Sequence, residues 1–137
     1  MSADPVMIAE TKAWLRKAAL DLKSAAHDLT ASPPLVADSV FHCQQAIEKA
    51  LKGYLCWHNI SFRKTHSLEE LGEQCLDIDS TLLELLDQAI PLTEYAWKFR
   101  YPGEPEEPTL DETHESLAIT RAVYQAIISR LPEEVRP

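Results

Sequence analysis

The sequence predicts an all-α protein, an up-and-down bundle of about five helices in a single domain spanning residues 1–137. Apolar residues recur at steps of three and four over long stretches, and no stretch alternates apolar and polar residues convincingly enough for a strand. The 137 residues suffice for one hydrophobic core but not for two, and they contain no internal repeat. We therefore expect the elements to be helices that pack around one core.

The first two helices are expected to be long. Residues 7–29 carry apolar side chains at the helical period, with charged side chains around the other side. Ser32-Pro33-Pro34 ends this helix, because proline has no amide hydrogen and disfavours helical backbone in the residue before it. A second helix over residues 35–57 has one apolar face, formed by Val36, Val40, Cys43, Ile47, Ala50, Leu51 and Tyr54.

Two shorter helices follow a loop over residues 59–65. Ser67 and Glu70 have the spacing of a capping box, in which each side chain satisfies a free backbone amide of the other residue. This predicts a third helix over residues 68–76. A fourth helix is expected over residues 81–99, and Pro91 should kink or split it.

The last helix follows a stretch that cannot be helical. Residues 100–108 contain three prolines and three glutamates, which indicates an exposed acidic loop. Thr109 and Glu112 form a second potential capping box. The helix that follows is expected to end at Pro132, with its apolar face formed by Leu117, Tyr124, Ile128 and Leu131.

Composition excludes several functional classes. There are 22 acidic and 13 basic residues, and the net charge of −9 disfavours a general electrostatic grip on duplex nucleic acid or an anionic membrane. The chain has 3 glycines and no glycine-rich phosphate loop. It has no run of about 18 apolar residues and no signal-peptide profile at its start. We therefore expect a cytoplasmic protein that does not enter a membrane.

The three cysteines lie within apolar, helix-periodic segments. Cys43, Cys56 and Cys75 have neither the paired nor the short spacings of zinc ligands. They are interpreted as buried, reduced thiols. The sequence thus predicts no metal site, and nothing in it calls for a cofactor.

A polar stripe on the second predicted helix is the main candidate for a ligand site. His42, Gln45, Lys49 and Lys52 recur at steps of three, four and three, which places them along one helix face. Two ammonium groups, an amide and an imidazole can together bind phosphate oxygens and a base edge. Because such a stripe is expected to be exposed, reversing the charges of Lys49 and Lys52 should change the free energy of unfolding by no more than about 0.5 kcal/mol.

Two other interpretations of this stripe stay open. Glu48 and Lys52 form a favourable i,i+4 pair, which is the ordinary reason for such spacing on a solvated helix face. In a dimer, the stripe would instead be the polar part of the subunit interface, with Phe41 as its apolar anchor.

Three further residues enter the ligand hypothesis. Arg100 offers a guanidinium fork for phosphate, and Tyr101 offers a ring on which a base can stack. His66 precedes a helix cap, where residues are commonly structural, so we interpret it as fixing the loop into the third helix.

Three strings occur in order along nearly the whole chain. They are FHCQQAIEKALK at residues 41–52, KTHSL at residues 64–68, and RYPG at residues 100–103, preceded by Tyr95. Together they resemble the HEPN family, the higher eukaryotes and prokaryotes nucleotide-binding domain. This resemblance implies a helical bundle that pairs as a homodimer, in a bacterial or archaeal setting. It also implies a minimal nucleotidyltransferase partner, often in a toxin–antitoxin pair.

The sequence departs from the ribonuclease branch of that family. In that branch, an arginine followed after four to six residues by a histidine promotes metal-free attack of the RNA 2′-hydroxyl on its neighbouring phosphate. Here the next histidine after Arg100 is His114, and Arg63 precedes His66 by only three positions. The tyrosine that follows this motif in the family, a target for adenylylation, is missing with it.

Two functional hypotheses follow from these residues. The first is a nucleotide- or RNA-phosphate-binding domain that acts with a minimal nucleotidyltransferase in a toxin–antitoxin type module. The alternative is a metal-independent ribonuclease with a non-standard active site, in which His42 or His66 is the base and Arg100 stabilises developing charge. The absent motif favours the binding hypothesis over an enzyme.

Overall fold

The computed structural model describes residues 4–103 and 106–137, and its ordered elements are all helical. Within these ranges the chain forms five α-helices, three short 3₁₀ segments and no strand. The all-α prediction with about five helices is therefore confirmed. Of the expected acidic loop over residues 100–108, residues 104–105 lie outside the part of the chain that the structure describes.

The first two helices match their predicted bounds closely. Helix α1 spans Pro5–Asp28 and begins two residues earlier than predicted, because the Asp4 carboxylate accepts a hydrogen bond from the Val6 amide and Pro5 suits the first helical turn. Helix α2 spans Val36–Trp57, beginning just after the Ser32-Pro33-Pro34 segment. The predicted break between the two helices is confirmed.

Pro91 splits the predicted fourth helix. Helix α3 spans Leu68–Ile78, and the Ser67 hydroxyl accepts a hydrogen bond from the Glu70 amide. A 3₁₀ turn, η1 (Ser80–Leu82), leads into α4 (Leu83–Ala89), and the chain tightens into the 3₁₀ segment η2 (Ile90–Ala96) where Pro91 occurs. Helix α5 (Leu110–Ser129) begins with a complete Thr109–Glu112 capping box and is followed by η3 (Glu133–Val135).

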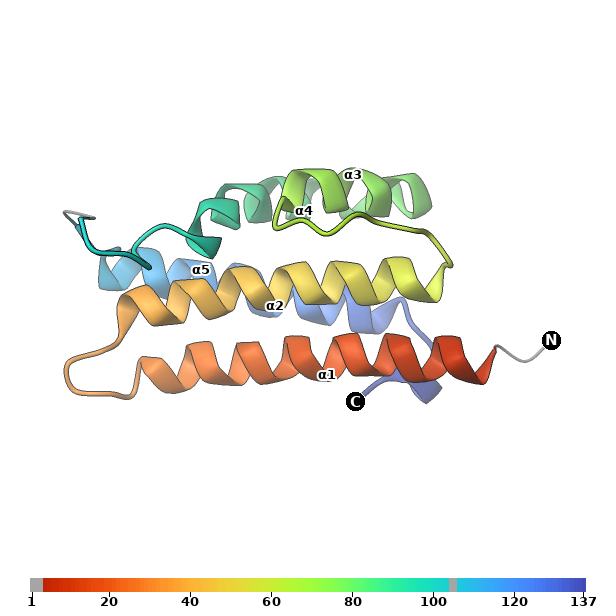
Figure 1. Ribbon diagram of the computed structural model, residues 1–137, viewed down its shortest axis with the longest axis horizontal. Coiled ribbons are helices and arrows are strands. Elements are labelled where there is room, and N and C mark those ends of the chain that lie inside the picture. The colour runs from red at the N-terminus through yellow and green to blue at the C-terminus, as the bar shows by residue number, and fades with distance from the viewer. Residues whose placement is uncertain (1–3, 104–105) are drawn as a thin grey trace.

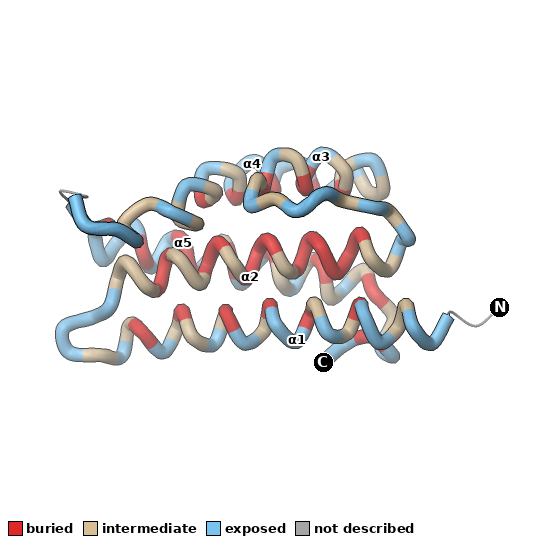
Figure 2. The backbone as a smooth tube through the Cα atoms, viewed as in Figure 1, coloured by how far each residue is buried: buried red, intermediate tan, exposed pale blue. Residues whose placement is uncertain are grey.

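Helix α2 is the centre of the bundle. Helix α1 runs antiparallel to it on one side, α3 and α4 lie on the opposite side, and α5 lies behind it in Figure 1. Buried residues accordingly line α2 along most of its length (Figure 2). The core includes side chains from all five α-helices, such as Leu15, Leu51, Leu71, Leu86 and Ile127. A helix surrounded in this way has little surface left for solvent.

One end of the bundle brings distant segments together. The turn between α1 and α2 and the segment that follows η2, residues 97–103, lie at the same end of the bundle, at the left in Figure 1. Arg100 on that segment reaches α2, where its Nη1 lies 3.3 Å from Asp38 Oδ1. Within the described ranges, no helix is long and apolar enough to cross a membrane.

Candidate functional site

The polar stripe on α2 does not face solvent as the sequence suggested. Lys52 is only 6% exposed and Glu48 is similarly buried, while His42, Gln45 and Lys49 are half-buried. The reason is the central position of α2, which turns the stripe toward α1 and the loop that follows α2. The prediction of an outer, solvated face is therefore wrong for Lys52 and Glu48.

Asp21 on α1 holds the first half of the stripe. Its Oδ1 lies 2.8 Å from His42 Nδ1, and its Oδ2 accepts a hydrogen bond from the Lys49 ammonium. Asp21 is itself buried. A carboxylate on Nδ1 fixes the ring so that Nε2 is the nitrogen available for other chemistry. The interaction thus orients His42 and neutralises Lys49.

Asp38 connects His42 to Arg100. Its Oδ2 lies 3.4 Å from His42 Nε2, and its Oδ1 accepts a hydrogen bond from Arg100 Nη1. The Arg100 guanidinium carbon also lies 3.7 Å from the centre of the Phe41 ring, a cation–π contact. The structure therefore brings together two of the residues singled out in the sequence, although 58 positions separate them.

A third carboxylate, that of Asp28, completes this charged cluster. Burial, and next a side-chain hydrogen bond with Asp38 and the charge of that carboxylate, raise the pKa of Asp28 to about 6, while the charges of His42 and His27 lower it. Its Oδ2 is buried and has no hydrogen-bond partner in the protein. Asp28, Asp38 and His42 each offer one potential ligand atom, and these three atoms lie within 4.8 Å of one another.

The cluster opens onto a groove of about 720 Å³ between α1 and α2. Leu20, Lys23, Ser24 and His27 line it together with Asp28, Asp38 and His42. Arg100 is partly exposed beside Asp38, and Tyr101 is 72% exposed. The groove thus has a mixed lining of apolar, acidic and basic groups that a small ligand or ion can reach.

Glu48 organises the second half of the stripe. Its Oε2 lies 3.1 Å from Lys52 Nζ, and its Oε1 lies 2.7 Å from His66 Nδ1. Gln44 donates one hydrogen bond to Glu48 and another to the His66 carbonyl oxygen. Gln45 donates to Gln44 in turn. This geometry agrees with a structural role for His66, which ties the loop before α3 to α2.

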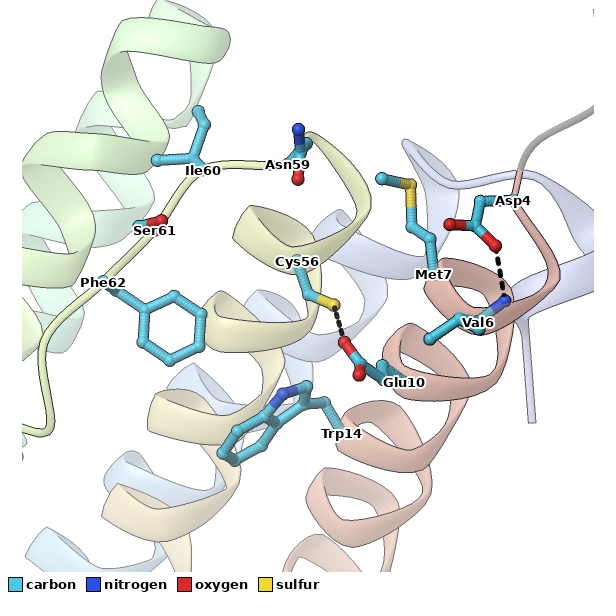
Figure 3. A pocket seen from close by; sticks show the side chains of 10 residues that line it. All are labelled: Asp4, Val6, Met7, Glu10, Trp14, Cys56, Asn59, Ile60, Ser61 and Phe62. Carbon is cyan, nitrogen blue, oxygen red and sulfur yellow. Dashed lines mark hydrogen bonds between the residues drawn. The ribbon is translucent and has the colours of Figure 1, made fainter.

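A second pocket, of about 370 Å³, lies where α1 begins and α2 ends (Figure 3). Trp14 and Phe62 meet edge to face there with ring centres 6.0 Å apart, and the Lys52 ammonium lies 5.5 Å from the Trp14 ring centre. Glu10 accepts a weak hydrogen bond from the Cys56 thiol. Because Asp4 and Glu10 also line this pocket, its charge disfavours a phosphate ligand.

The cysteines and tryptophans differ in how far they are buried, although all of them lie in segments with helical periodicity. Cys43 and Cys75 are buried, and burial raises their pKa values to about 11 and about 12. Cys56 is only half-buried. All three thiols are free, and two of the three are buried as predicted. Trp14 and Trp57 are half-buried, whereas Trp97 is 52% exposed.

Sequence reasoning missed the three aspartates that surround His42. Asp21 and Asp28 lie on the α1 face that meets α2, and Asp38 lies one turn before His42. The only local signal was that Asp38 and His42 are four residues apart, which puts them on one helix face. Nothing in the sequence paired Asp21 with His42 and Lys49, because that pairing depends on how α1 and α2 align.

The fold and this site define a small all-helical domain with a charged groove between its first two helices. The sequence profile of the HEPN domain family matches residues 11–131, so the chain belongs to the HEPN domain family. Comparison with curated proteins and with solved structures found no match.

Proposed function

We propose that this HEPN domain binds the phosphate of a nucleotide or of RNA at the groove between α1 and α2. The observation that carries the proposal is the placement of Arg100, whose guanidinium carbon lies 3.7 Å from the Phe41 ring centre and which shares the Asp38 carboxylate with His42. A guanidinium held over a ring keeps N–H groups available for the oxygens of a phosphate.

The proposal gives different roles to the six residues singled out in the sequence. His42, Arg100 and Tyr101 contact the ligand, with the exposed Tyr101 ring stacking on a base. Lys49 does not contact the ligand directly; its ammonium donates a hydrogen bond to Asp21 Oδ2, and Asp21 in turn holds His42. Gln45 and Lys52 already have partners within the protein, and they support the stripe rather than contact the ligand.

Calorimetric titration with ATP and with a short single-stranded RNA tests this proposal. Arg100→Ala should weaken binding at least about tenfold, the effect of losing a charged hydrogen bond of roughly 1.4 kcal/mol. Arg63→Ala is the matched control, because Arg63 is exposed and pairs only with Glu70 among the interactions described. Equal binding by wild type and Arg100→Ala, or an equal loss in both variants, would contradict the proposal.

Tyr101 provides a second, independent variant. If its ring stacks on a base, Tyr101→Phe should bind as well as wild type, whereas Tyr101→Ala should bind more weakly by about 1 kcal/mol or more. Equal affinity of the two variants would remove Tyr101 from the site without removing Arg100.

We further propose that the chain acts as a homodimer in the cytoplasm. Its exposed apolar side chains include Leu35, Trp97 and Leu110, and these occur in segments that lie at one end of the bundle (Figure 1). Light scattering after size exclusion should give twice the chain mass of 15.5 kDa for wild type. Trp97→Glu should shift the protein to the monomer, and an unchanged mass would contradict this interface.

The proposed partner is a minimal nucleotidyltransferase, in a toxin–antitoxin type module. The support is family membership, since HEPN domains often pair with nucleotidyltransferases. Affinity purification of the tagged protein from its own host, at native salt, should recover a small nucleotidyltransferase. Recovery of the tagged chain alone would favour a domain that binds its ligand without that partner.

A metal-independent ribonuclease is the second candidate, and one observation favours it. Asp21 fixes the His42 ring with Nε2 directed at Asp38, which also binds Arg100, so a potential base and a charge-stabilising group share one carboxylate. His66 contacts Glu48 rather than Arg100, which makes His42 the better base. RNA cleavage in the presence of EDTA should be lost in His42→Ala and Arg100→Ala but retained in His66→Ala.

A further inference from the structure

Three potential metal ligands lie close together in the lining of the groove between α1 and α2. Asp28 is the last residue of α1, while Asp38 and His42 lie one turn apart on α2. One ligand atom from each lies within 4.8 Å of the other two. Two carboxylates and one imidazole from two helices thus lie close together in the lining of the solvent-accessible groove.

The spacing of two of these groups already fits a metal ion. His42 Nε2 and Asp38 Oδ2 are 3.4 Å apart. Two ligands that each bind Zn²⁺ at about 2.1 Å and at a tetrahedral angle lie about 3.4 Å from one another. The Asp28 ligand atom lies within 4.8 Å of the other two.

Outer contacts orient the ligands in the way that metal sites require. Asp21 on His42 Nδ1 leaves Nε2 as the free nitrogen, and Lys49 holds the other oxygen of Asp21. Arg100 holds Asp38 Oδ1 and leaves Oδ2 directed at the imidazole. A metal-bound histidine nearly always has a partner of this kind on its other nitrogen.

A separate observation points to a cation as the missing partner. Asp28 is only 9% exposed, and its Oδ2 has no hydrogen-bond partner in the protein. A buried carboxylate oxygen without a partner is unfavourable, and binding a metal ion removes that cost. The local charge balance also favours a cation. In these contacts the three carboxylates of Asp21, Asp28 and Asp38 are matched by only two permanently positive groups, Lys49 and Arg100.

We propose that Asp28, Asp38 and His42 bind one divalent transition-metal ion, with Zn²⁺ as the best fit. One imidazole with two carboxylates suits Zn²⁺, whereas Mg²⁺ and Ca²⁺ prefer ligand sets made of oxygen alone. Three protein ligands leave a fourth position open toward the groove, where water or a ligand oxygen binds. This site does not depend on the proposed phosphate function, and when the ion is bound His42 contacts the ion rather than the phosphate.

Calorimetric titration of EDTA-treated, dialysed protein with Zn²⁺, without any nucleotide, tests the site. Wild type should bind one ion per chain, and Asp28→Asn and His42→Ala should each weaken binding at least tenfold. Asp28→Asn keeps the shape of the side chain, so its fold should be retained, and far-ultraviolet circular dichroism checks this. Asp77→Asn and His114→Ala alter exposed residues elsewhere and should bind Zn²⁺ like wild type.

Two outcomes would overturn the proposal. One is unchanged Zn²⁺ binding in both Asp28→Asn and His42→Ala. The other is loss of binding in Cys56→Ser, which would assign the ion to the half-buried thiol beside Glu10. A measurement on wild type avoids any folding defect: Zn²⁺ should shift the imidazole resonances of His42 in the NMR spectrum and leave those of His114 unchanged.

Discussion

Lys52 and Glu48 form an ion pair inside the bundle, with Nζ 3.1 Å from Oε2 and both side chains almost fully buried. The Lys52 ammonium also lies 5.5 Å from the Trp14 ring centre and 5.8 Å from that of Phe62. The sequence presents this pair as an ordinary i,i+4 contact on a helix face. Burial changes its energetics, because a buried charge that loses its partner is strongly unfavourable.

Lys52→Ala should therefore lower the free energy of unfolding by about 3 kcal/mol, since it leaves the Glu48 charge buried with His66 and Gln44 as its remaining polar contacts among the described residues. Lys17→Ala, on an exposed face of α1, should change it by less than about 0.5 kcal/mol. Urea denaturation of both variants checks this. Equal stabilities would mean that the pair is solvated.

The double reversal Lys49→Glu with Lys52→Glu should consequently unfold the protein. Each new carboxylate would face an existing one, that of Asp21 or of Glu48. This corrects the expectation, based on an exposed stripe, that the reversal leaves stability unchanged. Loss of binding in that double variant is therefore no evidence for a ligand site, whereas Arg100→Ala provides such evidence.

Gly53 and Gly72 should respond in opposite directions to alanine. A Cβ at Gly53 would lie 3.1 Å from Leu15 Cδ2 and 3.3 Å from Trp14 Cβ, because α1 and α2 approach closely there. Gly53→Ala should destabilise the protein by about 1–2 kcal/mol through overpacking. At Gly72 the nearest atom would be 3.7 Å away, so Gly72→Ala should stabilise α3 by up to about 1 kcal/mol. Thermal denaturation distinguishes these signs.

The Asp79 carboxyl should give stability a dependence on acid pH. Hydrogen bonds from the Thr81 side chain, and next from Arg130, lower the pKa of Asp79 from 3.8 to about 2. A lowered pKa in the folded protein means that the contribution is present above pH 3.8 and is lost as the pH falls toward 2. The stability gap between wild type and Asp79→Asn should therefore close over that window. Asp77→Asn, which alters an exposed residue nearby in sequence, is the control variant.

We expect His66 to stabilise the loop before α3 rather than to take part in catalysis. Its ring contacts Glu48 and its carbonyl oxygen accepts a hydrogen bond from Gln44. His66→Ala removes the ring contact alone, so we expect faster amide hydrogen exchange over residues 58–67 and a loss of about 1 kcal/mol in stability. His114→Ala, which alters an exposed histidine on α5, should leave that exchange unchanged. Unchanged exchange in His66→Ala would remove this structural role.

Several elements could be read from the sequence because their causes are local. Pro91 splits the fourth predicted helix, since a missing amide acts on its own turn. Thr109 and Glu112 begin α5 through a capping box that needs only residues three apart. Helix α1 begins two residues before its predicted start, because the Asp4 cap and Pro5 extend it beyond the apolar periodic segment.

The sequence by itself determined the helices, their breaks and membership of the HEPN domain family, because period, caps, prolines and ordered motifs are properties of neighbouring residues. Only the tertiary structure decided what the α2 stripe faces. The alignment of α1 against α2 places Asp21 on His42 and Lys49, and the return of the chain before α5 places Arg100 on Asp38. Side-chain periodicity identifies a helix face, but the partner of that face depends on packing between segments far apart in the chain.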